Sequence, residues 1–116
     1  MGYKAVFHID QEDDQIFNLC LNNIANTLTA LKGTDTDFVL LANGPGVAML
    51  AGETVYLYFE RIKQMLDAGV RFQVCSKALE KFEITPDDLA SGVEVIPAGI
   101  VGLIDLQNDG FAYIKP

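Results

Sequence analysis

Cys75 is the residue whose type and position most favour chemistry. It closes a short predicted strand, Val70 to Cys75, and directly precedes a segment with a helical pattern. The first N–H groups of a helix point outward, and together with the nearby Lys77 they would stabilise a thiolate. A lone cysteine is also commonly a buried packing residue. Both interpretations are open, and the position at a strand end favours a functional thiol.

His8 is the second candidate and the only histidine of the chain. If the first and third strands are neighbours, as in flavodoxin-like order, His8 reaches Cys75 and stabilises its thiolate or shuttles a proton. The alternative is a hydrogen-bonded core histidine. One histidine and two separated cysteines match no zinc spacing, so we expect no metal site. The acidic run Asp10 to Asp14 is typical of a solvated loop and helix cap, with a divalent ion as the alternative.

Cys20, the other cysteine, lies on an apolar stripe with helical spacing, together with Ile16, Ile24 and Leu28. This pattern predicts a packing role and an inert thiol. Because Cys20 is in mid-helix and Cys75 follows a strand, we expect no disulfide between them.

Alternating strands and helices must position these residues. Apolar runs predict strands at 4–9, 38–42, 70–75, 93–96 and 111–114. Helices are predicted at about 13–32, 53–68, 76–82 and 97–109, and a short one opens at 85–88. The strands lack a polar face, which favours a mostly parallel five-stranded sheet covered on both sides. The sequence therefore predicts a single domain, residues 1–116, with a three-layer, flavodoxin-like α/β/α fold.

Sheets of this kind carry their chemistry in the loops after the carboxyl ends of the strands. We therefore expect a pocket around Cys75. Its predicted lining is His8, Asn43, Gly44, Ser76, Lys77, Pro97 and Gly99. The segment Asn43-Gly44-Pro45-Gly46 matches neither a Walker loop nor a dinucleotide fingerprint, so a tight turn is expected there and no cofactor.

The helix at about 53–68 carries five consecutive apolar residues, Val55 to Phe59. Five residues span more than one turn, so one apolar side faces away from the sheet. We expect self-association through Tyr56, Tyr58 and Phe59. The alternative is that the loop at 46–51 covers them.

Composition limits the remaining choices. The chain has 116 residues, of which 50% are hydrophobic, so it can bury one core and is not a disordered tail. No apolar stretch approaches ~18 residues, so no membrane span is expected. The net charge of −8 disfavours nucleic acid as a partner. Two cysteines and the absence of a leader pattern predict free thiols in a reducing, cytoplasmic setting.

Several motifs together resemble the DsrE/DsrF-like family, which includes the TusD-like sulfur-relay subunits. They are Phe7-His8-Ile9-Asp10, Ala42-Asn43-Gly44-Pro45-Gly46, Gly69-Val70-Arg71-Phe72 leading to Cys75, Ile84-Thr85-Pro86-Asp87-Asp88-Leu89 and Val95-Ile96-Pro97-Ala98-Gly99. The resemblance covers essentially the full length and is nearest to the short, single-domain branch. Its strongest marker is the cysteine that closes the third strand, which matches Cys75.

The resemblance implies an α/β sandwich that forms homotrimers or hexamers. It also implies that Cys75 carries sulfane sulfur as a persulfide, received from a donor protein and passed to an acceptor thiol, without a cofactor. Such a role needs one activated thiolate and no resolving cysteine.

Two other interpretations compete with a sulfur carrier. The chain can be a non-catalytic, oligomeric module that binds a small ligand at the strand carboxyl ends. The second competing interpretation is a response-regulator receiver domain. Receivers have acidic residues after the first strand and a Lys-Pro pair after the fifth, and this chain has Asp10, Asp13, Asp14 and Lys115-Pro116 at those places. However, Cys75 stands where the phosphoacceptor aspartate of a receiver should be.

Overall fold

The chain folds as alternating strands and helices. The computed structural model describes residues 2–116. Its strands are β1 (Tyr3–Ile9), β2 (Thr36–Ala42), β3 (Arg71–Cys75), β4 (Glu94–Ile96) and β5 (Ala112–Ile114). Its α-helices are α1 (Asp14–Ala30), α2 (Gly52–Asp67), α3 (Ser76–Lys81) and α4 (Gly99–Asn108). Two further segments, Gly44–Leu50 and Pro86–Asp88, are 3-10 helical.

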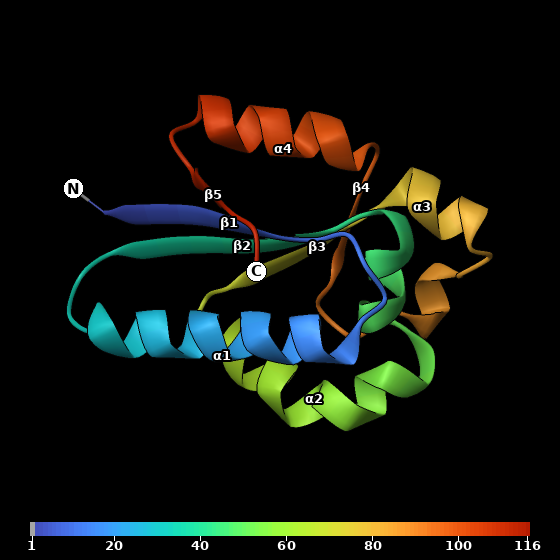
Figure 1. Ribbon diagram of the computed structural model, residues 1–116, viewed down its shortest axis with the longest axis horizontal. Helices are drawn as coiled ribbons and strands as arrows, with labels where there is room; N and C mark the ends of the chain where they lie inside the picture. The colour runs from blue at the N-terminus through green and yellow to red at the C-terminus, as the bar shows by residue number, and fades with distance from the viewer. Residues whose placement is uncertain (1) are drawn as a thin grey trace.

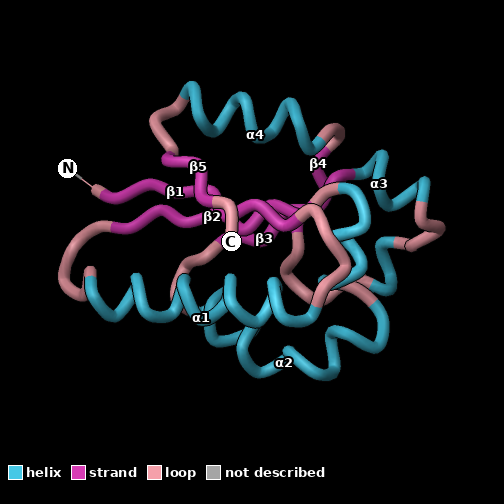
Figure 2. The backbone as a smooth tube through the Cα atoms, viewed as in Figure 1, coloured by secondary structure: helices cyan, strands magenta, loops and turns pink. Residues whose placement is uncertain are grey.

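The strands form one parallel sheet in the order β4-β3-β2-β1-β5. Helices α1 and α2 cover one face and α4 covers the other, and α3 lies at the end of the sheet (Figure 1). The backbone trace shows the same three layers (Figure 2). This is the three-layer, flavodoxin-like α/β/α sandwich that the sequence predicts.

The strand order corrects one expectation. Strand β2 lies between β1 and β3, so the first and third strands are not neighbours. The reason is that each connection from β1 through β4 places the next strand beside the previous one, always on the same side. Only the connection through α4 crosses back over the sheet, and it places β5 beside β1. The receiver-domain interpretation is wrong, because receivers pair their first and third strands.

Side chains of the central strands alternate between two buried faces. Phe7 and Leu40 pack in the large cluster beneath α1 and α2. Val6 and Val39 pack with Leu103 of α4 on the opposite face. A strand buried on both sides favours apolar residues, which explains the apolar stretches 5–7 of β1 and 38–42 of β2.

Local signals set the ends of the long helices. Asp13 is the N-cap of α1, and its Oδ1 accepts a hydrogen bond of 3.0 Å from the backbone N–H of Ile16. Gly69 follows α2 with φ 94°, a left-handed conformation that favours glycine. Among residues 2–116, no helix combines the length and the apolar character that a membrane span needs.

The start of α4 differs from the prediction. The helix begins at Gly99 rather than at Pro97, because Ala98 is its N-cap and has extended backbone angles of φ −150° and ψ 122°. The extended Pro97–Ala98 step carries the chain from the sheet edge at β4 to the opposite face. The first turn of α4 thereby reaches the carboxyl ends of β2 and β3.

Two further boundaries differ by small amounts. Cys75, rather than Ser76, is the N-cap residue of α3. The segment after β2 is more than a tight turn, because it opens the 3-10 segment Gly44–Leu50, with Asn43 as its extended N-cap. This segment packs against the sheet through several buried side chains. Asn43 therefore joins β2 to a segment that packs against the sheet.

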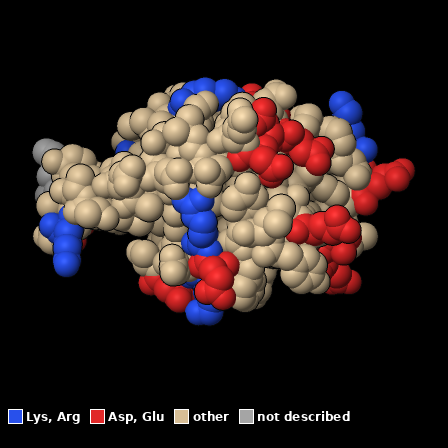
Figure 3. Space-filling model, turned by 60° about the horizontal axis from the view of Figure 1, so that its bottom comes forward, with Lys and Arg blue, Asp and Glu red and all other residues tan. Residues whose placement is uncertain are grey.

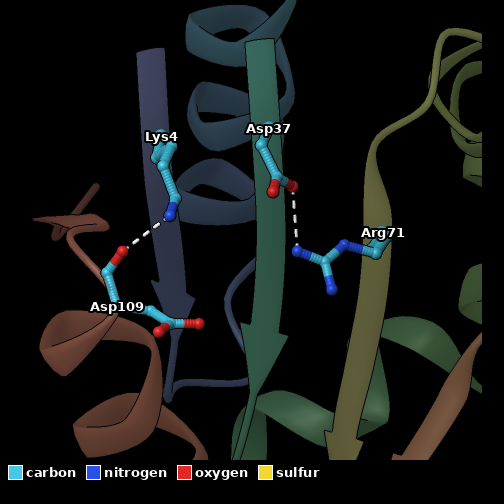
Figure 4. Close-up of polar contacts among 4 residues, drawn as sticks. All are labelled: Lys4, Asp37, Arg71 and Asp109. Atoms are coloured by element: carbon cyan, nitrogen blue, oxygen red, sulfur yellow. Dashed lines mark hydrogen bonds and ion pairs between the residues drawn. The ribbon is translucent and has the colours of Figure 1, made fainter. Parts of the chain in front are cut away.

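Polar contacts fasten the end of the sheet opposite the candidate site. Arg71 of β3 donates to Asp37 of β2 with an Nη2–Oδ1 distance of 2.8 Å (Figure 4). Lys4 of β1 donates to the backbone carbonyl of Asp109 at 2.6 Å, which ties β1 to the turn after α4 (Figure 4). Because the Arg71–Asp37 pair is partly exposed, it stabilises the fold by about 1 kcal/mol at most.

Helix α2 leaves apolar side chains in solvent. Tyr56 is 85% exposed and Leu57 75% exposed, and Phe59 is also exposed. The segment at 46–51 therefore does not cover them, and that alternative is wrong. Tyr58 instead packs its ring edge-on against Phe17 of α1, with centroids 4.9 Å apart. Uncharged side chains cover much of the face that carries α1 and α2, with charged groups in separate clusters (Figure 3).

Candidate functional site

The carboxyl ends of β2 and β3 meet the first turn of α4 around a pocket of about 380 Å³. Cys75 lies in its wall. The other lining residues come from the segment after β2, from α3 and its end, and from the start of α4: Asn43, Gly44, Pro45, Lys77, Ala78, Lys81, Phe82, Ala98, Gly99 and Ile100. The pocket lies where ligands bind in open α/β sheets, outside the carboxyl ends of the strands.

Cys75 is the last residue of β3 and the N-cap of α3. Its register partner on β4 is Ile96, so its backbone is held by the sheet. The residue is only 7% exposed, but it borders the pocket. The sulfur is therefore shielded from bulk solvent and still has a route of approach.

The start of α4 packs directly against Cys75. A Cβ built on Gly99 would lie 3.1 Å from Cβ of Cys75 and 2.9 Å from Cβ of Asn43. Only glycine permits so close an approach. Neither Ala98 nor Cys75 caps its helix with a side chain, so backbone N–H groups at both helix starts are left without a side-chain cap. Such groups stabilise a nearby anion.

Lys77 and Lys81 of α3 give the pocket a positive character. Neither lysine forms an ion pair with any of the described residues, and no Asp or Glu is among the pocket's lining. Lys81 instead lies over the ring of Phe82, with Nζ 5.7 Å from the centroid. Since the whole chain carries a net charge of −8, this pocket is a local exception.

His8 does not contact Cys75, which corrects the direct Cys–His contact considered above. Its Nε2 lies 2.7 Å from Oδ1 of Asn43, and its Nδ1 lies 2.6 Å from the hydroxyl of Tyr113 on β5. Both ring nitrogens are thus occupied, and His8 is buried. The intervening β2 keeps the ring one strand away from the pocket, so His8 reaches it only through Asn43.

The acidic run after β1 is used for local contacts. Asp10 pairs with Lys115, and the hydrogen bond from this lysine is the main cause that lowers the pKa of the Asp10 carboxyl. Asp13 caps α1, as expected for a helix cap. Among residues 2–116, no three His, Cys, Asp or Glu side chains gather closely enough to hold a metal ion.

The structure gathers only part of the predicted lining. Asn43, Gly44, Lys77 and Gly99 do line the Cys75 pocket. Ser76 does not, and Pro97 borders a separate hollow with Gln73 of β3 and Asp105 of α4. His8 lies behind Asn43 rather than in the wall.

Sequence reasoning missed Lys81 and Tyr113. Lys81 lies one turn after Lys77, and that spacing on a helix could have indicated a shared face. Tyr113 had no sequence signal, because its contact with His8 spans 105 positions and depends on β5 pairing with β1.

Cys20 has the packing position that the sequence predicts. It is fully buried in the cluster beneath α1 and α2. Burial raises the pKa of the Cys20 thiol to about 12. Both cysteines are free, and Cys20 is the unreactive one at neutral pH.

A larger hollow, of about 630 Å³, lies between the second half of α1 and the strands β1 and β5. Its lining is mainly apolar and contains no Cys, His, Asp or Glu among the described residues. Because the described lining of this hollow offers no thiol, imidazole or carboxylate, we take the smaller Cys75 pocket as the candidate site.

Known proteins match the chain along nearly its whole length. The sequence model of the DsrE/DsrF-like family matches residues 4–116. The structure of MTH1491 from Methanobacterium thermoautotrophicum has 32% identity and a TM-score of 0.90, covering 98% of this chain and 99% of that chain. The ychN protein from E. coli has 15% identity and a TM-score of 0.73, covering 98% and 99%.

BT1422 from Bacteroides thetaiotaomicron has 20% identity and a TM-score of 0.68, covering 97% of this chain and 95% of that chain. At 15% and 20% identity, the ychN and BT1422 structures show a shared fold and nothing more. A comparison with curated proteins gave no match.

Proposed function

This chain belongs to the DsrE/DsrF-like family, and from that premise we propose that it carries sulfane sulfur as a persulfide on Cys75 and passes it to an acceptor thiol. The observation that carries the proposal is the position of Cys75 in a pocket with two lysines and no carboxylate in its described lining. A persulfide ionises to an anion, and such surroundings favour the anionic form.

Sulfur uptake needs only a thiolate and a donor persulfide. The Cys75 thiolate attacks the outer sulfur of the donor's R–S–SH group. A new S–S bond forms on Cys75, the S–S bond of the donor breaks, and the donor leaves as the thiolate R–S⁻. The proton stays on the transferred sulfur until Cys75–S–SH ionises, so no external oxidant or reductant takes part.

Release repeats the exchange in the other direction. An acceptor thiolate attacks the outer sulfur of Cys75–S–SH, the S–S bond to Cys75 breaks, and Cys75 returns as a thiolate. Cys20 takes no part in this scheme, because its sulfur is fully buried and its pKa is raised to about 12. One reactive cysteine is enough for a carrier, and free thiols fit a reducing compartment such as the cytoplasm.

Intact-mass measurement tests the proposal. The reduced protein is incubated with inorganic polysulfide, and we expect one added sulfur atom in the wild type and in Cys20→Ala, and none in Cys75→Ser. Cys20→Ala is a matched control, because it removes the other thiol without adding a polar group to the core. A folded wild type that takes up no sulfur would refute the carrier and favour the small-ligand-binding module.

We also propose that the exposed part of α2 joins copies of this chain. Tyr56, Leu57 and Phe59 lie within about one turn of α2, and all three side chains are exposed. Side chains of this size in water favour a protein partner. Tyr58, by contrast, already packs on Phe17, so we assign the contact to its exposed neighbours.

A further inference from the structure

Asn43 has a polar group that no described residue uses. Its Oδ1 accepts the hydrogen bond from His8, whereas its Nδ2 donates to none of residues 2–116. Every buried side-chain nitrogen and oxygen of the described residues has a partner, so Nδ2 is open to solvent. Asn43 itself is one of the residues that line the Cys75 pocket.

Asn43 and Cys75 approach the same point. A Cβ built on Gly99 would lie 3.4 Å from Nδ2 of Asn43 and 3.1 Å from Cβ of Cys75. Nδ2 of Asn43 and Cβ of Cys75 therefore both lie against the start of α4 at Gly99. A persulfide extends the cysteine by one S–S bond of about 2 Å, which brings the outer sulfur into reach of a neighbouring donor.

We propose that Asn43 donates a hydrogen bond through Nδ2 to the outer sulfur of the Cys75 persulfide and that His8 is the positioning residue for this amide. The inference rests on the proposed function and deepens it, because it names the groups that retain the transferred sulfur. The two lysines supply diffuse positive charge, whereas the amide supplies a directed contact.

His8 fixes which way the amide points. Oδ1 can only accept, so Nε2 of His8 carries a hydrogen, and in the neutral ring Nδ1 then accepts the O–H of Tyr113. If the amide turned over, Nδ2 would face the N–H of His8 and both groups would lose a partner. The hydrogen bonds on His8 thus hold Oδ1 inward and Nδ2 toward the pocket.

The experiment compares persulfide stability in wild type, Asn43→Ala, Asn43→Asp, His8→Phe and His8→Gln. Inorganic polysulfide supplies sulfur, glutathione removes it, and intact mass gives the ratio of persulfide to thiol on Cys75 at equilibrium. A hydrogen bond to a charged group is worth about a tenfold change in such a ratio. We expect a decrease of about tenfold in Asn43→Ala and in His8→Phe.

The remaining variants separate positioning from structure. Asn43→Asp keeps the shape and the acceptor for His8 but loses the donor, so its ratio should fall at least as far as in Asn43→Ala. His8→Gln supplies an amide N–H near the position of Nε2 and should keep most of the wild-type ratio. The double variant His8→Phe with Asn43→Ala should be no worse than Asn43→Ala alone, because His8 acts through Asn43.

Three outcomes would overturn the inference. The first is a ratio of persulfide to thiol in Asn43→Asp that equals the wild-type ratio. The second is a double variant in which the effects of His8→Phe and Asn43→Ala add. The third is a folded His8→Gln whose ratio falls as far as that of His8→Phe. If the wild type takes up no sulfur, the proposed function fails and this inference fails with it. A wild type that takes up sulfur while Asn43→Asp does so equally leaves the carrier intact and refutes only the role of Asn43.

Discussion

Replacing Gly99 by alanine tests the close approach of α4 to the candidate site. The new Cβ would lie 2.9 Å from Cβ of Asn43 and 3.1 Å from Cβ of Cys75. Both atoms are attached directly to backbone that the sheet holds, so neither can rotate away. The start of α4 must shift instead. Gly102, in the next turn of the same helix, is a matched control, because its added Cβ would meet only Cδ1 of Ile96 at 2.7 Å and Cδ1 of Leu41 at 3.3 Å.

The expected magnitudes follow from these contacts. Overpacking against rigid atoms destabilises a protein by about 1–3 kcal/mol. An alanine in a helix gains up to about 1 kcal/mol over glycine, and this gain applies to both variants. Neither glycine has a positive φ, so no backbone strain adds to the comparison. We expect Gly99→Ala to be less stable than Gly102→Ala by about 1–2 kcal/mol, because the terminal methyl groups near Gly102 can move.

Thermal unfolding at equal protein concentration measures the difference. For a domain of this size, about 1 kcal/mol corresponds to a shift of about 4 °C in Tm, so the two variants should differ by roughly 4–8 °C. The rate at which iodoacetamide alkylates Cys75 should also differ from the wild-type rate in Gly99→Ala. In Gly102→Ala this rate should equal the wild-type rate. Equal melting temperatures for the two variants would refute the close packing of α4 on Asn43 and Cys75.

Two further predictions concern the core thiol and the surface of α2. Burial raises the pKa of Cys20 to about 12, so the folded chain keeps a proton that the unfolded chain loses above ~8.5. The free energy of unfolding should therefore fall as the pH rises from about 9 toward 12. Urea unfolding should show a smaller fall over this pH range in Cys20→Ala than in the wild type. Equal falls in the two proteins would contradict the raised pKa of Cys20. Tyr56→Asp should lower the mass in light scattering without changing the melting of secondary structure, and an unchanged mass would mean that α2 is not an interface.

The fold was predictable because its signals are local. The run 38–42, which became most of β2, is apolar at every position, and that pattern is typical of a strand buried on both faces. Asp13 and Gly69 mark helix ends through their own backbone preferences. Local signals were weaker at Pro97, where a good first helical residue lies in the extended step before α4.

The candidate site was predictable only in part. Cys75 and Lys77 follow directly from the end of a strand and the start of a helix, so their place depends on neighbours in sequence. The role of His8 depends on its distance from Cys75, and that distance depends on strand order. Strand β2 lies between β1 and β3, so His8 binds Asn43 and not the cysteine.

The sequence by itself determined that the chain is a layered α/β domain with one cysteine at the end of a strand and another inside a helix, because periodicity and strand ends are properties of short segments. Only the tertiary structure decided that Gly99 of α4 packs against Cys75 and that Tyr113, His8 and Asn43 form one hydrogen-bonded chain. These contacts join residues from strands and helices far apart in the sequence. The contact of Tyr113 with His8 exists because the crossover through α4 returns the chain to the opposite edge of the sheet and brings β5 beside β1, whereas His8 meets Asn43 because β1 lies beside β2.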